Sequence, residues 1–495
     1  MATEKTVIGL DVGTTGTKAA VCRKDGTVLG KGYREYDLRF GASGEVEQSA
    51  EDWYTAAAAA VTEAMRQANV GAESVAALSL STQGGSMLAW DRDFRPLTPV
   101  MTWMDRRAAD EIAALCSALG EETLYRTSGW KPTASNDIAK ILWVREHWPE
   151  AFAKTACFST TLEYMNRRLT GKTVGDPTNE AIRILFDIRR GAYDGKILSA
   201  LGIGEDRLPA VQPTGSFVGT LTAEAAKDLG LTTAVRVYNG AHDQYCASLG
   251  AGAVENGDMM VATGTAWVVL AITDRLLFSE SRVSPGIHPV RGLYGAMASL
   301  VSAGSALKWY KNLIGEDYAS LDAGAAARRE HAADLFFAPY LAGAGFPHPD
   351  PNEPSRLIGL KLAHDRYDIA LALMEGVAFE VRAVLDELRS LGCSVRRLYM
   401  AGRTAHSDLW RGLVRDICGC EILVTDEPDT CCVGAAMIAA VGAGMYPSLE
   451  KAVRGISRLS IRDVPDAAQT AFYQTKYRRY RELLAGETAK GNTKS

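Results

Sequence analysis

The sequence lacks the features that mark secreted, membrane-spanning and nucleic-acid-binding proteins. Its first residues lead directly into an apolar segment, without the basic stretch and long apolar core of a signal peptide. The longest weakly polar run, Cys431 to Tyr446, is largely alanine and glycine and shorter than a membrane span, so it predicts a buried helix. Basic residues are interspersed with acidic ones and the net charge is −5. We therefore expect neither a nucleic acid nor a membrane as partner.

The cysteines give no sign of disulfides or of a zinc site. There are nine of them, an odd number at irregular spacing, which is typical of reduced thiols in the cytoplasm. Cys418-Gly-Cys420 and Cys431-Cys432 have no histidine or cysteine partners at zinc-site spacing. These thiols are expected to pack in the core.

The two commonest nucleotide-binding fingerprints are also missing. No G-x-G-x-x-G follows a predicted strand, which argues against a dehydrogenase. Gly171-Lys-Thr173 imitates the end of a P-loop, but Asn166 stands where its first glycine belongs. We interpret this stretch as a helix end followed by a turn.

A repeated local pattern is present instead. A chain of 495 residues is long enough for two or three domains. It opens with predicted strands over 7–12, 18–23 and 27–32, a helix over about 49–68 and a strand over 76–81. The pattern of strand, Gly-Thr turn and strand recurs over 257–271. This alternation indicates an α/β protein with two similar halves and a ligand between them.

The two Gly-Thr turns are candidate phosphate sites. Gly13 to Thr17 can present backbone N–H groups and hydroxyls to an anion, although an ordinary hairpin explains one such turn equally well. The second copy, Thr263-Gly-Thr265, favours two turns that clamp one polyphosphate from both sides. Asp11 supplies a carboxylate beside the first turn, where a hard cation would need oxygen ligands.

A candidate catalytic acid follows the strand predicted over 234–238. Asp243 could serve as a general base at the mouth of a cleft, but its position is equally typical of a helix N-cap, which would lower its pKa. His242 is a second candidate base, though a lone histidine more often packs or forms hydrogen bonds. Ser81 to Ser86 and Trp103 to Arg107 combine amide, charged and indole groups that suit a polyol pocket. Two surface loops would explain them as well.

Taken together, these segments resemble the FGGY carbohydrate kinases of the actin-like ATPase superfamily. The matching segments occur in the family's order over nearly the whole chain: Ile8 to Lys18, Glu45 to Gln48 before Trp53, Trp103 to Arg107, Leu169 to Gly171 with Asp176, Gly240 to Gln244, Ala262 to Thr265, Leu398 to Ile417 and Gly434 to Ala436. The resemblance implies an α/β fold with two duplicated ribonuclease-H-like domains, 1–250 and 251–495, and a cleft between them for ATP and substrate.

The resemblance also assigns roles to individual residues. Asp243 would be the catalytic base and, with Asp11, would hold Mg²⁺. The residues implied to bind ATP are Gly13, Thr14, Thr15, Lys18, Gly264 and Thr265 at the phosphates and Gly304, Lys308, Gly402, Arg403 and His406 at the adenosine. The residues implied to surround the acceptor are Gln83, Gly84, Trp103, Asp105 and Gln244.

The implied activity is ATP-dependent phosphorylation of a hydroxyl of a small sugar or polyol. A ketose such as xylulose is favoured over glycerol, other polyols and sugar acids. A nucleotide-binding regulator without a sugar acceptor is the alternative from another class, and family members are often cytoplasmic homodimers.

The sequence departs from the family pattern in three places. Xylulose kinases commonly have Met-His and glycerol kinases Arg-Glu where this chain has Gly84-Gly85, so we expect a roomier pocket there. Ala241-His-Asp-Gln244 is closer to the Gly-Asp-Gln of glycerol kinases than to the Gly-Asp-Asn of xylulose kinases. Arg403 stands where a run of glycines is usual and could alter the adenine site.

Overall fold

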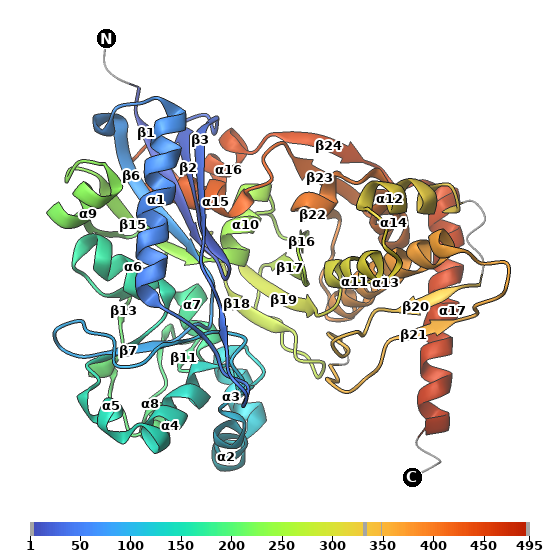
Figure 1. The fold of residues 1–495 in the computed structure, drawn as a ribbon, viewed down its shortest axis with the longest axis horizontal. Coiled ribbons are helices and arrows are strands. Elements are labelled where there is room, and N and C mark those ends of the chain that lie inside the picture. The colour runs from blue at the N-terminus through green and yellow to red at the C-terminus, as the bar shows by residue number, and fades with distance from the viewer. Residues whose placement is uncertain (1–3, 330–333, 348, 492–495) are drawn as a thin grey trace.

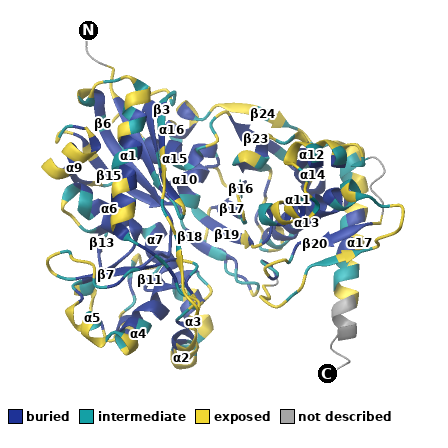
Figure 2. Cartoon of the chain, viewed as in Figure 1, coloured by how far each residue is buried: buried dark blue, intermediate teal, exposed yellow. Residues whose placement is uncertain are grey.

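The computed structural model describes residues 4–329, 334–347 and 349–491. Figure 1 shows two lobes, each built around a twisted sheet with helices on both faces. The lobe on the left contains the N-terminal half together with α15 and α16 from the other half. Figure 2 shows that both sheets and the helices between them are buried.

The sheet of the N-terminal lobe has six strands in the order β14-β15-β6-β1-β2-β3. The first three strands form an antiparallel meander, and β1 also pairs in parallel with β6, which pairs in parallel with β15. The bounds are β1 (Thr6–Val12), β2 (Gly16–Arg23), β3 (Val28–Glu35), β6 (Val75–Thr82), β14 (Phe217–Thr220) and β15 (Arg236–His242). The meander and the strand after the first helix, both predicted from the sequence, are confirmed.

The second sheet repeats this arrangement. Its order is β18-β19-β17-β16-β22-β23-β24, so a meander of three strands again continues into two parallel strands. The bounds are β16 (Asp258–Thr263), β17 (Trp267–Thr273), β18 (Ser284–Ile287), β19 (Tyr294–Leu300), β22 (Arg397–Ala401), β23 (Glu421–Thr425) and β24 (Leu459–Asp463). The shared strand order confirms the predicted duplication of an α/β unit.

The described residues form seventeen α-helices. In the N-terminal half they are α1 (Ala50–Ala68), α2 (Ala109–Leu119), α3 (Glu121–Ser128), α4 (Asp137–His147), α5 (Pro149–Lys154), α6 (Thr161–Thr170), α7 (Pro177–Ile182), α8 (Gly195–Leu201), α9 (Ala223–Leu229) and α10 (Asp243–Ala251). In the C-terminal half they are α11 (Gly304–Ile314), α12 (Tyr318–Ala326), α13 (Arg366–Ser390), α14 (Asp408–Cys418), α15 (Thr430–Gly442), α16 (Leu449–Ile456) and α17 (Ala467–Gly491).

Short strands and 3-10 turns complete the fold. The strands are β4 (Arg39–Phe40), β5 (Val46–Gln48), β7 (Leu88–Trp90), β8 (Val100–Met101), β9 (Cys157–Ser159), β10 (Val174–Gly175), β11 (Phe186–Asp187), β12 (Ala192–Tyr193), β13 (Ala210–Val211), β20 (Phe336–Ala338) and β21 (Arg356–Ile358). The 3-10 turns include Ala72–Ser74, Glu205–Arg207 and Arg403–His406.

Two helices connect the halves by crossing between the sheets. Helix α10 follows β15 and packs on the second sheet, whereas α15 follows β23 and packs on β1 and β6. The two helices also contact each other closely: a Cβ on Gly250 would lie 2.0 Å from the Thr430 carbonyl oxygen, and one on Gly434 would lie 1.9 Å from that of Cys246. Glycine is therefore required at both contacts, because a methyl group would force the helices apart.

Helix α15 is the buried helix predicted from the alanine-rich run. All nine cysteines are free thiols, seven of them buried. Gly171, in the segment that imitates a P-loop, is the left-handed C-cap of α6, as predicted. Among the described residues, no helix combines the length and apolar content that a membrane span requires.

Candidate active site

The two candidate carboxylates lie at the same edge of the first sheet. Asp11 is near the end of β1 and Asp243 directly follows β15, with β6 between these two parallel neighbours. Ser81, at the end of β6, donates a hydrogen bond of 2.7 Å from Oγ to Oδ1 of Asp11. The negative charge of Asp243 contributes to the raised pKa of Asp11, so the fold brings the two acids together.

Burial raises the pKa of both carboxyl groups. Asp11 is raised to about 6, mainly by burial and against the hydrogen bond from Ser81. Asp243 is also raised to about 6 by burial, against hydrogen bonds from the backbone and side chain of Gln244. The N-cap interpretation of Asp243 is wrong, because the N-cap of α10 is His242 and its side chain makes no capping bond. Asp243 is thus more basic than an ordinary aspartate, as a general base requires.

The same pair of carboxylates fits Mg²⁺. Within the described part of the chain, no group of three or more His, Cys, Asp or Glu side chains could enclose a metal ion. Mg²⁺ at a nucleotide needs fewer protein ligands, because it keeps several waters and takes phosphate oxygens together with one or two carboxylates. Two nearby acids, of which Asp243 raises the pKa of Asp11, are a suitable partial ligand set.

An irregularity in β15 directs Asp243 toward this edge. The register between β15 and β6 shifts between Tyr238 and Ala241. A Cβ on Gly240 would lie 2.0 Å from the Leu80 carbonyl oxygen, so the shift requires glycine there. Asn239 fixes the bend by donating from Nδ2 to the carbonyl oxygens of Gly175 and Gln212, both at 2.9 Å. Such bulges commonly redirect side chains at active sites.

The first Gly-Thr turn joins β1 and β2 and is held by three outside side chains. The Tyr36 hydroxyl donates to the Gly13 carbonyl oxygen at 2.5 Å, and Gln48 Nε2 donates to the Thr14 carbonyl oxygen at 2.5 Å. Trp103 Nε1 donates to Thr14 Oγ1 at 2.9 Å. The indole assigned to the acceptor pocket thus touches the turn assigned to the phosphates.

Glycines from distant segments pack against the second Gly-Thr turn, which joins β16 and β17. A Cβ on Gly304, the first residue of α11, would lie 2.2 Å from the Gly264 carbonyl oxygen. Gly402 has a φ of 98°, and a Cβ there would lie 2.8 Å from the Thr263 carbonyl oxygen. Four of the residues assigned to ATP, Gly264, Thr265, Gly304 and Gly402, are therefore brought together around one turn beside the first turn of α11.

The charged residues assigned to ATP lie in different surroundings. Lys308 on α11 and Arg403 and His406 after Gly402 are exposed. Lys18 donates to Asp429 Oδ1 at 2.9 Å, and Asp429 immediately precedes α15. The Lys18 ammonium is therefore committed to an ion pair between the two halves of the chain, which also raises its pKa.

Buried polar atoms in two acceptor candidates and in the residues beside them have no hydrogen-bond partner among the described protein groups. These atoms are Thr82 Oγ1, Gln83 Oε1, Asp243 Oδ1 and Gln244 Oε1. They occur on two neighbouring parallel strands, β6 and β15, and in the segments that follow them. Because an unpaired buried polar atom is costly, this set suits a ligand rich in hydroxyl groups. Trp103, with 46% of its surface exposed, offers an apolar ring nearby.

Asp105 differs from the prediction. Its side chain is fully buried, and Oδ2 accepts from the Val46 backbone N–H at 2.9 Å and from Arg107 at 2.7 Å. Arg107 also donates to Glu47 at 2.7 Å. The Asp105 carboxylate is therefore used to hold the segment that carries Trp103, and the assignment to direct acceptor contact is corrected.

The expected extra room at Gly84 is also absent. A Cβ on Gly84 would lie 2.4 Å from Ile182 Cδ1 and 2.7 Å from His242 Cδ2. Gly85 has a φ of 68°, and its nearest neighbours would be Ile182 and Trp103. The space next to Gly84 is filled by side chains from α7 and from the end of β15.

The sequence analysis missed Lys140, which holds two segments of the acceptor pocket together. Its side chain is fully buried in α4, and Nζ donates to the carbonyl oxygens of Gly85 at 2.7 Å and Thr102 at 2.9 Å. Those two carbonyls belong to the segments that carry Gly84 and Trp103. A lysine within an otherwise apolar stretch, Ile138 to Val144, is the signal that could have indicated it.

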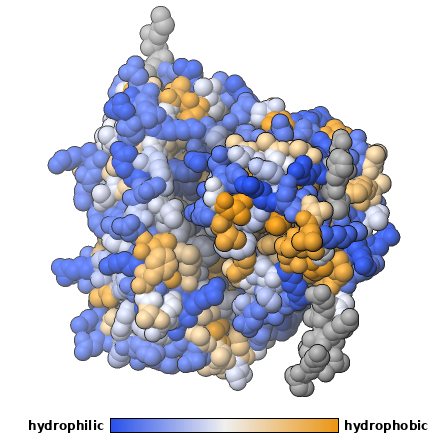
Figure 3. Space-filling model, turned by 45° about the vertical axis from the view of Figure 1, so that its right-hand side comes forward, coloured by the Kyte–Doolittle hydropathy of each residue, from blue (hydrophilic) through white to orange (hydrophobic). Residues whose placement is uncertain are grey.

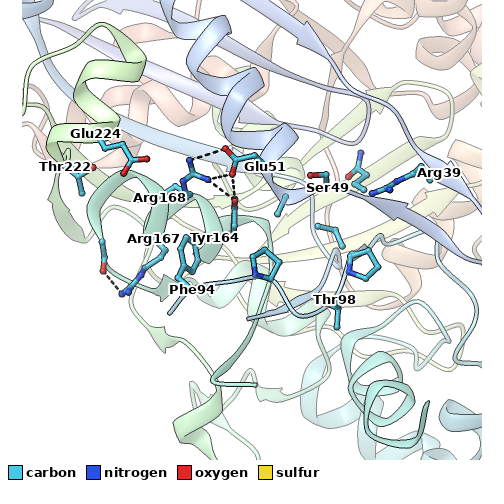
Figure 4. Close-up of a pocket in the computed structure, with 16 residues that line it drawn as sticks. Arg39, Ser49, Glu51, Phe94, Thr98, Tyr164, Arg167, Arg168, Thr222 and Glu224 are labelled. Carbon is cyan, nitrogen blue, oxygen red and sulfur yellow. Dashed lines mark hydrogen bonds and ion pairs between the residues drawn. The ribbon is translucent and has the colours of Figure 1, made fainter. Parts of the chain in front are cut away.

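A hollow lined by residues of the N-terminal lobe is shown in Figure 4. It has a volume of about 710 Å³ and lies between the start of α1, the loop before β8 and α6. Its charged groups largely satisfy each other, since Arg168 pairs with Glu51 and Tyr164. Figure 3 shows a separate groove between the two lobes and apolar side chains gathered on the C-terminal lobe.

Comparison with known proteins agrees with this geometry. The model of the FGGY family of carbohydrate kinases, N-terminal domain, matches residues 6–250, and that of the C-terminal domain matches residues 259–443. The xylulose kinase of Bacillus subtilis is 29% identical over 97% of this chain and 96% of its own length. The glycerol kinase of Thermus brockianus is 31% identical over 98% of this chain and its whole length. The crystal structure of the xylulose kinase from Rhodospirillum rubrum is 28% identical, with a TM-score of 0.89 over 97% and 99% of the two chains.

The matches of both halves to carbohydrate kinase models and to a kinase structure place this duplicated α/β protein among the phosphotransferases. The chain belongs to the FGGY family of carbohydrate kinases. Its substrates are therefore ATP and a small sugar or polyol.

Proposed function

We propose that the enzyme transfers the γ-phosphoryl group of ATP to a hydroxyl of a small ketose, with xylulose as the first candidate. The observation that carries the mechanism is the juxtaposition of Asp11 and Asp243 at one sheet edge, each with a pKa raised to about 6 by burial. At neutral pH Asp243 is ionised but more basic than an exposed aspartate. It is therefore suited to accept the proton of an attacking hydroxyl.

The transfer is an in-line displacement. The acceptor oxygen forms a bond to the γ-phosphorus while the bond from that phosphorus to the β,γ-bridging oxygen breaks, and ADP leaves with the bridging oxygen. The hydroxyl proton passes to Asp243. Asp11, through water, and Asp243 would hold Mg²⁺, which neutralises charge on the phosphate oxygens when bound.

The remaining residues position the two substrates. Gly13 to Thr15 on one half and Gly264 with Thr265 on the other would bind the phosphates. Gln83, Gln244 and Trp103 would bind the acceptor, the amides through its hydroxyls and the indole through its carbon face. Positioning and charge stabilisation account for most of the rate in phosphoryl transfer, so this division of roles suits the chemistry.

The relatives named xylulose kinase support a ketose acceptor. Glycerol or another polyol is the second candidate, and the 31% identity with the Thermus brockianus glycerol kinase and Gln244 after the catalytic aspartate favour it. The two candidates differ in the carbonyl group of the ketose, which could accept a hydrogen bond from the unpartnered Thr82 hydroxyl.

The test is acceptor-dependent ADP release by the purified full chain with ATP and Mg²⁺. We expect release to depend on the acceptor, with kcat/KM for xylulose at least tenfold above that for glycerol, xylitol and gluconate, a ratio worth about 1.4 kcal/mol. A higher value for glycerol would select the second candidate. Slow release that no acceptor accelerates would instead indicate a nucleotide-binding regulator.

A further inference from the structure

The space beside Gly84 is occupied by His242. A Cβ on Gly84 would lie 2.7 Å from Cδ2 and 2.9 Å from Nε2 of His242, and 2.4 Å from Ile182 Cδ1. The φ of Gly84 lies outside the left-handed region, so its backbone conformation would accept any residue. Only the neighbouring side chains exclude a larger residue. The Ile182 methyl group is the end of a flexible side chain and can turn away, which leaves the imidazole as the main obstacle.

The imidazole is held in this place by its surroundings. The His242 backbone N–H donates to Thr178 Oγ1 at 2.8 Å, and Thr178 Oγ1 donates to Asp176 Oδ2 at 2.7 Å. The Tyr245 ring lies against the imidazole edge-on, with ring centroids 6.2 Å apart. His242 is 7% exposed, so its ring has little room to move away from Gly84.

The same imidazole touches the proposed catalytic base. His242 Nε2 lies 3.0 Å from Oδ1 of Asp243. The two atoms are in polar contact without hydrogen-bond geometry, since Asp243 Oδ1 has no hydrogen-bond partner among the described residues. A hydrogen on Nε2 would place the positive end of an N–H dipole beside this carboxylate oxygen. The imidazole edge thus packs against the Asp243 carboxylate at Oδ1 and limits how far this group can rotate. Gly84, His242 and Asp243 therefore form a continuous set of contacts.

We propose that His242 is a positioning and specificity residue: it orients the Asp243 carboxylate and forms the acceptor-pocket wall beside Gly84, where glycine is needed to admit it. This inference rests on the proposed function, because it concerns the same acceptor and the same base. With His242 and Ile182 as the wall, the pocket accepts an unbranched acceptor and excludes a substituent on that side. The two roles predict an effect on kcat and an effect on acceptor choice.

A double-mutant cycle with Gly84→Ala and His242→Ala tests the coupling. In the wild-type background, the new methyl group of Gly84→Ala must displace the imidazole, and we expect kcat for the acceptor to fall about tenfold or more with KM for ATP unchanged. In the His242→Ala background the methyl group has room, and adding Gly84→Ala should change kcat by less than about twofold. Gly85→Ala is the matched control, because its φ of 68° imposes the same backbone strain in both backgrounds.

His242→Gln and a panel of acceptors complete the test. Glutamine can donate an N–H toward Asp243, so its kcat should lie between the values for His242→Ala and wild type. His242→Ala should raise relative kcat/KM for branched acceptors about fivefold or more, a change worth roughly 1 kcal/mol. The surface variant His147→Gln should keep all wild-type values. Thermal unfolding shows whether each variant is folded. If the alanine variants do not fold, His242→Gln and its acceptor panel still test the proposal.

The outcomes separate this inference from the proposed function. Wild-type protein that shows no acceptor-dependent ADP release would overturn the proposed function itself. Wild-type protein that phosphorylates an acceptor, with Gly84→Ala equally harmful in both backgrounds or His242→Gln no better than His242→Ala, would overturn only the role of His242.

Discussion

Replacing Asp243 with asparagine should inactivate the enzyme and at the same time stabilise it at neutral pH. Burial raises the pKa of this carboxyl group from 3.8 to about 6. A shift of roughly 2 units at about 1.36 kcal/mol per unit gives about 3 kcal/mol of unfavourable free energy for the ionised form in the folded state. Because 27% of the side chain is exposed, solvent screening reduces this to about 2 kcal/mol.

The sign follows from proton binding. Between about pH 4 and pH 6 the folded state holds the proton on Asp243 more tightly than the unfolded state, so the free energy of unfolding falls as pH rises through this window. Above pH 6 the full cost of burying the ionised Asp243 carboxylate is present. Asparagine carries no charge and therefore removes this cost. Asp243→Asn should therefore unfold at a higher urea concentration than wild type at pH 8, and this gain should shrink toward pH 4.

Two assays check this prediction together. ADP release with the best acceptor should fall by roughly 10²–10⁴-fold, the usual contribution of a positioned general base. Urea unfolding at pH 8 and pH 5 should give the stability change. Asp105→Asn is the matched control, because that fully buried carboxylate pairs with Arg107 and its loss should destabilise the protein at pH 8. An Asp243→Asn protein that is less stable than wild type at pH 8, or that turns over within tenfold of it, would refute the reasoning.

Two further predictions concern the helix contact and the metal. Gly434→Ala should lower the free energy of unfolding by about 2–4 kcal/mol, because its methyl group would lie 1.9 Å from the Cys246 carbonyl oxygen. A Cβ on Gly486 of α17 would meet no described atom within 4 Å outside its own helix turn, so Gly486→Ala should instead raise the free energy of unfolding by up to about 1 kcal/mol. Urea unfolding of both variants measures the contrast. Chelation of divalent cations should abolish ADP release, and Asp11→Asn should raise the Mg²⁺ concentration for half-maximal rate about tenfold or more. A wild-type Mg²⁺ titration for Asp11→Asn would exclude Asp11 from the metal site.

The local elements and the duplication could be predicted from the sequence. Strands and turns such as β1, β2 and β16 depend on apolar, β-branched runs and on Gly-Thr turns, which act over a few residues. The repeat of that pattern in mid-chain gave the two halves, and ordered motifs gave the family. Asp11 and Asp243 could be named as candidates because Asp11 lies at the end of one predicted strand and Asp243 follows another.

Which groups meet was decided by the tertiary structure. Lys18 pairs with Asp429 and Arg107 with Glu47 because segments distant in the sequence pack together. The raised pKa of Asp243 depends on burial, which no local pattern encodes.

Gly84 shows most clearly the difference between what the sequence predicts and what the tertiary structure decides. Its sequence context predicted an open pocket, but the strand order places the end of β15 beside the end of β6, and His242 fills the space. The sequence by itself determined the strands, turns, repeat and family, because these follow from short-range periodicity and motif order. Only the tertiary structure decided which side chains occupy each space and what charge environment they experience, because both depend on packing between distant segments.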